Sequence, residues 1–321
     1  MLRKFIASFR AQRVLQNISR LLGDQVLTLL DIGAAGGVQP RWKQITHKTA
    51  YVGFEPDARS NLDIAKAGKD FASYRLIPAA VWNHDGELSI QLCRKPQVSS
   101  HFAPNTEFLR KFPKPERFDV LDSATVHANR LDTLNIDACD FIKLDIQGGE
   151  LAALQGGEAL LGKTLGLEIE VEFLPLYQGQ PLFGDLCAYL AGQGFEFMDF
   201  TSICRWDRRV RTGLGQCVFA DALFLKSPEC IRQQFDQAAI SFADVRRYLA
   251  ILALYRRVEL MAACQGLFAE ELKQDGDFSR ELAGVVRQLN KELRSVRFLA
   301  RMLSRYVLRF LGNDIRLHIT Y

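Results

Sequence analysis

The chain has 321 residues, enough for one large domain or two small ones with a sizeable buried core. Its composition, 48% hydrophobic and 24% charged, is that of an ordinary soluble globular protein. The net charge of +4 is too small to indicate a nucleic-acid partner, and the seven cysteines form no C-x-x-C pair that would suggest a zinc site. The first residues lack the apolar core of a secretory signal, and no apolar run approaches the ~18 residues of a spanning helix, so we predict a cytoplasmic protein.

Basic residues gather at both ends of the chain. Residues 2–22 place apolar side chains at helical spacing and carry five Lys or Arg without an acid. From Arg287 to Arg316 there are eight Lys or Arg against two acids, a net charge of +6. A basic amphipathic helix can lie on an anionic membrane surface, which makes peripheral contact with the inner membrane face one expectation. The alternative for these helices is packing on the domain or forming a homodimer.

A strand and a glycine-rich turn occupy residues 27–40. Apolar or β-capable residues lead into Asp31, and small residues follow at positions 33–37. This pattern predicts a buried parallel strand and a tight strand-to-helix turn. Small residues there let a ligand approach the backbone closely, as in nucleotide-binding folds. The spacing is not G-x-G-x-x-G, so it leaves the ligand open.

The next strand, in residues 51–57, ends in an acid. Glu55 lies 24 residues after Asp31. In doubly wound nucleotide-binding folds, an acid about 20 residues past the glycine turn holds the ribose. A carboxylate suits this task because it can accept hydrogen bonds from both ribose hydroxyls. We therefore predict that Glu55 binds a ribose.

Further strands and helices alternate up to residue 226. We predict a helix over 57–68, a third strand in 74–82, a hairpin turn at Asp85-Gly86, a long surface loop over 94–115, a strand in 119–134 and a buried strand in 141–150.

The strand expected at 165–173 is unusual because Glu168, Glu170 and Glu172 alternate along it and face one side. A central parallel strand is normally apolar on both faces, and burying three unpaired carboxylates would be costly. The strand must therefore be an edge strand, or its C-terminal part must open into a site.

The alternation of strands and helices predicts an α/β, doubly wound domain. Ser227-Pro228-Glu229 marks its end, with a helix N-cap and a proline at the first helical position. Beyond it the chain reads as helical to about residue 312, with a break near Asp275-Gly276. Arginines at 297, 301, 305 and 309 form a ridge on the last helix. We predict an N-terminal helix at 1–23, the α/β domain at 24–228 and a helical extension at 229–321.

Seven motifs in residues 27–226 carry a family resemblance. They are, in order, LLDIGAAGG, GFEP, AAVWNHDGELSI, RLDTL, FIKLDIQGGELAALQGG, EVEFLPLYQGQPLF and ADALFLK. In this order they resemble the FkbM-type S-adenosylmethionine-dependent methyltransferases. The resemblance implies a Rossmann-like class I methyltransferase sheet, S-adenosyl-L-methionine as cofactor, and a small-molecule or glycan acceptor. It does not reach the last ~95 residues.

The resemblance also implies roles for residues of the motifs. Asp31 and the backbone of Gly33, Ala34, Ala35 and Gly36 would hold the methionine part of the cofactor. Glu55 would bind the ribose hydroxyls, and Pro56 would shape the turn. Ala80 and Val81 would line the adenine pocket, and Asp145 would lie beside the methionine amino group or the acceptor. One position departs from the family pattern. Its usual Glu is Gln147 here, and an amide cannot ionise.

Methyl transfer from a sulfonium is an in-line displacement that needs positioning and removal of the acceptor's proton. Asp145 and Glu170 are the predicted catalytic residues, and Glu170 ranks first for touching the acceptor because ligands bind at the carboxyl ends of such strands. His101 and His127 are further candidate bases, although His127 in its strand is better explained as structural. We expect substrate contacts from His101, Tyr177 and Gln180, with a structural role for the turn of the last two left open. No metal-binding pattern is found.

The sequence therefore predicts a methyltransferase that acts on a hydroxyl of a sugar, a glycan precursor or a natural product. Two alternatives stay open. One is a non-catalytic binding or assembly module with the same fold. The other is a nicotinamide-dependent oxidoreductase, against which the G-x-x-G-G spacing counts.

Overall fold

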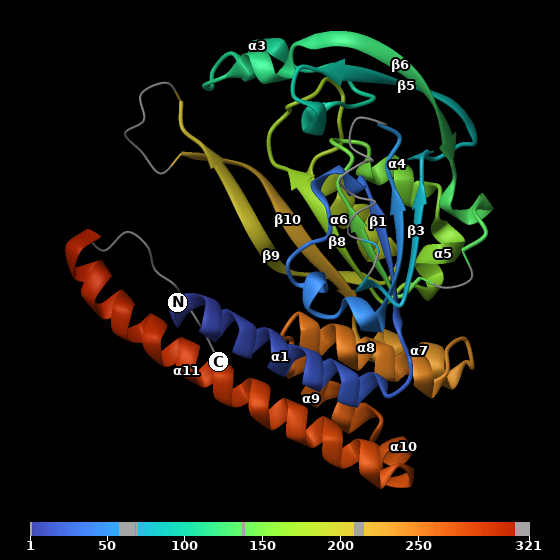
Figure 1. Cartoon of the computed structure of the whole chain (residues 1–321), viewed down its shortest axis with the longest axis vertical. Helices are drawn as coiled ribbons and strands as arrows, with labels where there is room; N and C mark the ends of the chain where they lie inside the picture. Colours follow the sequence, from blue (N-terminus) through green and yellow to red (C-terminus); the bar gives the residue numbers. More distant parts are fainter. Residues whose placement is uncertain (1, 58–67, 69, 137–138, 209–214, 312–321) are drawn as a thin grey trace.

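The computed structural model describes residues 2–57, 68, 70–136, 139–208 and 215–311 (Figure 1). Side chains of residues 2–11 and 295–311 are also outside the description. The predicted helix over 57–68 lies almost wholly outside the described residues. So do the basic side chains at the start of the N-terminal helix and the arginine ridge at 297–309.

Within the described residues, the centre of the fold is a seven-stranded sheet in the order β3-β2-β1-β7-β8-β10-β9. The first five of these strands are parallel, and β10 runs antiparallel to both of its neighbours. The bounds are β1 Leu27–Ile32, β2 Thr49–Phe54, β3 Ser73–Ile77, β7 Phe141–Leu144, β8 Gly166–Glu172, β9 Phe195–Trp206 and β10 Gln216–Lys226. This is the predicted doubly wound α/β sheet.

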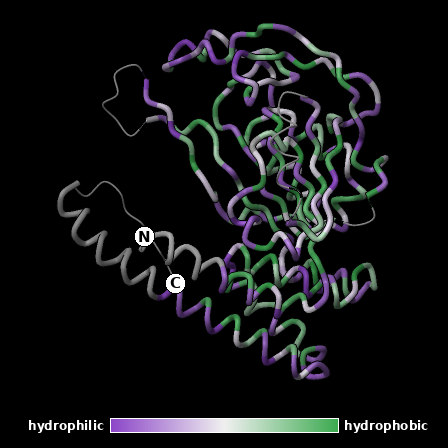
Figure 2. The backbone as a smooth tube through the Cα atoms, viewed as in Figure 1, coloured by the Kyte–Doolittle hydropathy of each residue, from purple (hydrophilic) through white to green (hydrophobic). Residues whose placement is uncertain are grey.

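Hydrophobic side chains pack on both faces of this sheet, as its nearly continuous apolar strands require. Figure 2 shows hydrophobic residues concentrated along the central strands. One face is covered by α4 (Glu150–Gln155), α5 (Glu158–Lys163) and α6 (Phe183–Gly192). The other core joins the strands to the helices at both ends of the chain. The carboxyl ends of the parallel strands stay clear of these layers and point to the top of Figure 1.

The N-terminal helix and the C-terminal helices share that second core. Ile18 and Leu21 of α1 (Leu2–Leu22) pack in one cluster with Leu29 of the sheet and Leu249 of α8 (Phe242–Leu254). The remaining helices are α7 Pro228–Asp236, α9 Val258–Leu267, α10 Ala269–Gln274 and α11 Gly276–Leu311. The division of the chain into three domains stays a prediction. In the part of the chain that is described, no helix combines the length and apolar character needed to cross a bilayer.

A second, three-stranded sheet lies over the carboxyl ends of the parallel strands (Figure 1). Its order is β4-β6-β5, with β4 Ala80–Val81, β5 Gly86–Cys93 and β6 Val120–Asn129. The predicted hairpin at Asp85-Gly86 is wrong, because β5 pairs with β6 and not with β4. Asp85 instead accepts hydrogen bonds from the Arg130 backbone N–H (2.9 Å) and the Thr133 hydroxyl (2.7 Å). The single strand predicted over 74–82 is divided between the two sheets.

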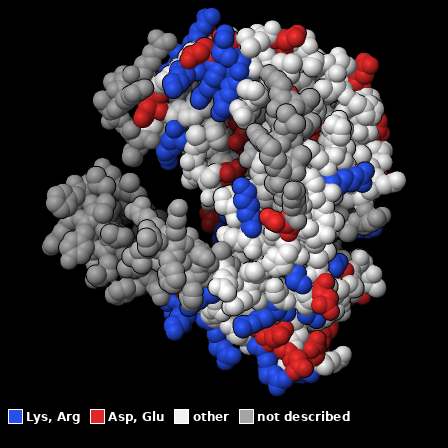
Figure 3. All heavy atoms as spheres, in the orientation of Figure 1, with Lys and Arg blue, Asp and Glu red and all other residues white. Residues whose placement is uncertain are grey.

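The segment between β5 and β6 holds three short helices and is not one irregular loop. They are η5 (Pro96–Val98), α3 (Thr106–Leu109) and η6 (Pro115–Phe118). Lys and Arg side chains gather around this segment at the top of Figure 3, where the sequence contains Arg110, Lys111 and Lys114. Basic charge therefore also lies beside the second sheet, away from the C-terminal segment that the sequence singles out.

The prediction that β8 could be an edge strand is wrong, because it lies between β7 and β10. Its first acid, Glu168, is 3% exposed and is compensated by three side chains from distant elements. Arg41 and the hydroxyl of Tyr255 each donate to its Oε2 at 2.5 Å, and Thr201 donates to its Oε1. This buried position tolerates a carboxylate because the carboxylate is paired with an arginine and accepts hydrogen bonds.

Candidate active site

A cavity of about 360 Å³ lies between the carboxyl ends of β1, β2 and β7 and the second sheet. Strand-end residues supply one side of it, among them Gly33, Glu55 and Asp145. Residues of β4, β5 and β6 supply the opposite side. Ligands bind at this place in open α/β sheets, so we treat the cavity as the candidate active site.

The turn after β1 brings backbone close to this cavity. Gly33 has φ +83°, and a Cβ built on it would lie 1.8 Å from the carbonyl oxygen of Asp145. Any other residue would therefore clash with the β7 end. The turn continues as η1 (Ala34–Gly36), and Gly33 and Ala35 line the cavity.

Glu55 connects this turn to the end of β2. Its Oε2 accepts the backbone N–H of Ala35 at 3.0 Å, and its Oε1 accepts that of Asp57 at 2.8 Å. Each carboxylate oxygen keeps a further lone pair for a ligand hydroxyl. The side chain is 5% exposed, and burial raises the pKa of its carboxyl. Glu55 is thus fixed at the cavity wall as an acceptor.

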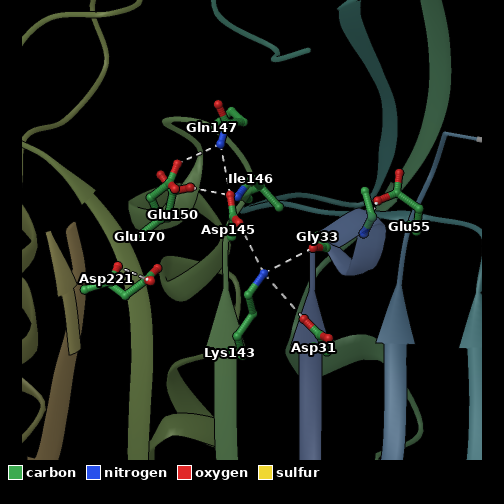
Figure 4. A network of polar contacts seen from close by, with 12 residues as sticks. Asp31, Gly33, Glu55, Lys143, Asp145, Ile146, Gln147, Glu150, Glu170 and Asp221 are labelled. Carbon is green, nitrogen blue, oxygen red and sulfur yellow. Dashed lines mark hydrogen bonds and ion pairs between the residues drawn. The ribbon is translucent and has the colours of Figure 1, made fainter. Parts of the chain in front are cut away.

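A buried lysine lies at the centre of the polar network in Figure 4. Lys143, on β7, is 7% exposed, and its ammonium lies 3.6 Å from Asp31 Oδ1 and 3.3 Å from Asp145 Oδ2. It also donates to the carbonyl of Gly33 at 3.2 Å. These contacts hold the ends of β1 and β7 together. Our sequence reasoning did not assign Lys143 a role, although a lysine inside an apolar strand was a signal for one.

Gln147 holds two of the acids in place. Its amide nitrogen donates to Asp145 Oδ1 at 2.9 Å and to Glu170 Oε1 at 2.7 Å (Figure 4). Its amide oxygen accepts the Tyr177 hydroxyl at 2.9 Å. Its backbone has φ +58°, a left-handed conformation that is rare outside glycine. Ser100 donates to the Gln147 carbonyl at 2.7 Å. An amide is suited to this position because it donates to both carboxylates while accepting from tyrosine.

Three acids behind Asp145 have raised pKa values. Burial is the main cause for each, and repulsion from neighbouring carboxylates adds to it. The pKa of Glu150 rises to about 7, and its Oε1 accepts the Ile146 backbone N–H at 2.8 Å. The pKa values of Glu170 and Glu172 lie well above the ordinary range. The site is therefore rich in acids, several of which hold protons at moderately low pH.

The structure brings most, but not all, predicted site residues to the cavity surface. The lining includes Gly33, Ala35, Glu55, Pro56, Ala80, Val81, His101, Asp145 and Gln147. Asp31 is not part of it, because it is buried behind the turn, where it accepts the Tyr51 hydroxyl at 2.8 Å. Ala34 does not line it either, and Gly36 lies outside the residues whose side-chain surroundings are described. The roles assigned to all these residues stay predictions.

Three predicted acceptor contacts are also displaced from the cavity wall. Glu170 lies behind Gln147, and Tyr177 is fully buried, with its hydroxyl oxygen also 3.0 Å from the Val98 carbonyl oxygen. Gln180 is 8% exposed and accepts the Tyr177 backbone N–H. These residues support Gln147 instead of facing the cavity. Local sequence cannot reveal this, because Tyr177 and Gln180 pack against Gly148 in the loop after β7, which is distant along the chain.

His101 does line the cavity, on an exposed rim beside Trp82. The two ring centroids are 4.9 Å apart, and His101 Nδ1 lies 2.9 Å from the Ser89 carbonyl oxygen. Because a carbonyl can only accept, Nδ1 carries the proton, and Nε2 of the neutral ring is an acceptor. His127 is exposed on β6 and does not line the cavity. Among the described residues, no group of three or more His, Cys, Asp or Glu is arranged to hold a metal ion.

The sheet order with its single reversed strand, the close turn after β1 and the acid after β2 define a Rossmann-like class I methyltransferase. The family model described as the methyltransferase FkbM domain matches residues 31–197, and the chain belongs to this family. It is an S-adenosylmethionine-dependent methyltransferase of the FkbM type.

Individual relatives are distant. The chain is 26% identical over 197 residues to the 2-O-methyltransferase NoeI of Sinorhizobium fredii, with 56% of this chain and 79% of NoeI covered. Methyltransferase FkbM from Methylobacillus flagellatus KT has 15% identity and a TM-score of 0.38, over 62% of this chain and 43% of that one. The chain thus spans less than half of that protein. Magnesium protoporphyrin IX methyltransferase from Synechocystis PCC 6803, solved with bound cofactor, has 12% identity and a TM-score of 0.34, over 71% and 84%.

The residues of the cavity fit S-adenosylmethionine. The small residues Gly33 and Ala35 bring the backbone of the turn to the cavity wall, and Glu55 presents buried acceptor oxygens there. The cofactor supplies a methyl group on a cationic sulfonium. Asp145 offers the site a carboxylate in the cavity wall, which Lys143 and Gln147 orient. A carboxylate in this wall complements a sulfonium and an ammonium group.

Proposed function

We propose that this protein transfers the methyl group of S-adenosylmethionine to a hydroxyl oxygen of a sugar or of a sugar-containing acceptor. The observation that carries the proposal is one cavity that joins Glu55 and the Gly33 turn to Asp145 and His101. The residues proposed to bind the cofactor and the groups able to accept a proton therefore border the same cavity. The resemblance to a protein named as a 2-O-methyltransferase supports oxygen as the methylated atom.

In this proposal the residues divide the work between binding and proton removal. Glu55 binds the ribose, Ala80 and Val81 contact the adenine, and the turn at Gly33 approaches the methionine part. Asp145 and His101 Nε2 are the groups on the cavity wall that can take the acceptor's proton. Glu170 contributes by holding Gln147, and through it Asp145, in position. Positioning of the two reactants supplies much of the acceleration in such a displacement.

The first test is calorimetric titration of S-adenosylmethionine and of NAD into the wild-type protein, Glu55→Gln and Glu55→Ala. Losing a charged acceptor of the ribose hydroxyls should cost ~1.5–3 kcal/mol, which is roughly ten- to a hundred-fold in affinity. Glu87→Ala, on the exposed side of β5, is the matched control and should bind like the wild type. Circular dichroism checks that each variant is folded.

Binding of NAD, or equal affinity of wild type and Glu55 variants for S-adenosylmethionine, would contradict the proposal. If the cofactor binds, transfer of a labelled methyl group to a panel of sugars and glycosides tests the acceptor. Cofactor binding with no transfer to any hydroxyl, amine or thiol acceptor would favour the non-catalytic module. Contact with an anionic membrane through the terminal helices is a separate proposal, and co-sedimentation with anionic liposomes at low salt tests it.

A further inference from the structure

The cavity has a second wall that the cofactor roles leave unused. It is formed by five aliphatic residues of β5 and β6, which we call the aliphatic wall: Leu88, Ile90, Leu92, Ala124 and Val126. The register of the two strands pairs Leu88 with Val126 and Ile90 with Ala124. Because side chains alternate along a strand, all five lie on one face of this ribbon. Figure 1 shows the ribbon passing over the carboxyl ends of the central sheet.

Three residues of the wall, Ile90, Leu92 and Ala124, line the cavity and do not belong to a packed hydrophobic core of the described residues. The side chains that alternate with them, Glu87 and Ser89 on β5, are exposed, as expected for an outer face. Ile90, Leu92 and Ala124 are half-buried, yet among the described residues they belong to none of the packed hydrophobic clusters. An apolar-inside pattern normally points into a core. Here it points into the cavity.

The wall also extends away from the end assigned to the adenine. β4 carries Ala80, which pairs with Ala128 of β6. From Ala128 to Ala124 is four residues, or about 13 Å of extended strand. The region beside Ile90 therefore lies about 13 Å along the ribbon from the end at which the adenine is expected. Polar groups of Ser100, His101 and Gln147 line the same cavity.

We propose that the aliphatic wall is a subsite for an apolar group of the methyl acceptor, carried next to the hydroxyl that is methylated. The inference rests on the proposed function and adds the chemical class of the substrate: an amphipathic molecule, such as a sugar with an alkyl or acyl substituent. Its hydroxyl lies among the polar groups near Asp145, and its apolar group covers Ile90 and Leu92. A free, fully polar sugar leaves this surface uncovered.

The test uses a series of alkyl β-D-glucopyranosides, from methyl to hexyl, titrated into protein saturated with S-adenosylhomocysteine. Binding to the wild type should tighten by about fourfold per methylene that the wall buries. Ile90→Asn and Leu92→Asn place an amide in the wall and should flatten this dependence. Leu121→Asn, at an exposed position of β6 outside the cavity, is the matched control and should keep the wild-type slope. Cofactor affinity should be unchanged in all three variants.

Several outcomes overturn the subsite. They are the absence of binding by the hexyl compound, a flat series in the wild type, and a wild-type slope in both wall variants. A loss of cofactor affinity in Ile90→Asn would assign the wall to the cofactor instead. Circular dichroism checks folding, and Leu92→Asn carries the test if Ile90→Asn does not fold. A wild-type protein that binds no S-adenosylmethionine refutes the proposed function itself. Cofactor binding with a flat series refutes only the subsite.

Discussion

Replacing Gln147 with glutamate should make the stability of this protein depend strongly on pH. The change removes two donated hydrogen bonds and puts a third carboxylate within about 3 Å of Asp145 and Glu170. Two unit charges ~4 Å apart repel by about 4 kcal/mol at the effective dielectric of a partly buried site. The folded variant relieves this repulsion by holding a proton, which raises the pKa of the group above its unfolded value of about 4.5.

The sign of the effect follows from proton counting. Between pH 5 and pH 8 the folded variant binds a proton that the unfolded chain has released, so stability falls as pH rises, by up to ~1.4 kcal/mol per pH unit and proton. We expect the free energy of unfolding of Gln147→Glu to match the wild type most closely at pH 5. At pH 8 it should be lower by roughly 2–4 kcal/mol.

Urea unfolding from pH 5 to pH 8 measures this difference. Gln147→Met is the control, because it removes the same hydrogen bonds without adding a charge. Its loss of stability relative to the wild type should vary much less with pH. Equal pH dependence in the two variants, or a Gln147→Glu protein as stable as the wild type at pH 8, would refute the account of Gln147 as a neutral clamp between two acids.

Three further predictions concern buried charges, and urea unfolding measures each. Lys143→Met leaves the buried carboxylate of Asp31 and the partly exposed one of Asp145 without their cation, and should cost about 3–5 kcal/mol at pH 8. The cost should be smaller at pH 5, because burial raises the pKa of Asp31 and favours its protonation, whereas the exposed Lys163→Met should have little effect. Glu150→Gln keeps an oxygen that accepts the Ile146 N–H and removes a carboxyl group whose pKa is raised to about 7 by burial. Folded Glu150 retains its proton above the unfolded pKa, so its stabilisation is lost as pH rises toward 7. The variant should therefore gain up to ~3 kcal/mol over the wild type at pH 8 and almost nothing at pH 4. Tyr255→Phe removes a hydrogen-bond donor to buried Glu168 and should lower the free energy of unfolding by ~1–3 kcal/mol. An unchanged free energy of unfolding would contradict a stabilising link between the end of α8 and the sheet.

Much of the candidate site could be predicted from local sequence. Strand ends and tight turns can be recognised from residues that are adjacent in the sequence. This is why sequence patterns identified the glycine turn, Glu55 at the end of β2 and Asp145 after β7. The order of strands and helices then places these ends at one edge of a parallel sheet. The same local signals placed Ser227 at a helix start, where its hydroxyl accepts the Cys230 N–H.

Pairing between distant residues could not be predicted. Asp85-Gly86 has the local chemistry of a tight hairpin, yet β5 joins β6, which begins some 27 residues after β5 ends. Strand pairing follows from how whole surfaces are buried, and turn propensity alone does not decide it. That pairing creates the aliphatic wall, so the class of acceptor we infer depends on a contact that sequence patterns misjudged.

The fold class, the family and the strand-end positions of the residues predicted to bind the cofactor could be inferred from sequence, because periodicity, turns and motifs are local. How the charges are compensated depends on contacts between distant residues. From sequence alone, Glu168 is unfavourable in a central strand because no neighbouring residue compensates it. In the fold, Arg41, 127 residues away, and Tyr255, 87 residues away, donate hydrogen bonds to its carboxylate. Likewise Lys143 and Gln147 acquired roles only once the ends of β1, β7 and β8 were brought together. A buried ionisable group is stable or not according to its neighbours in space, and chain order does not show those neighbours.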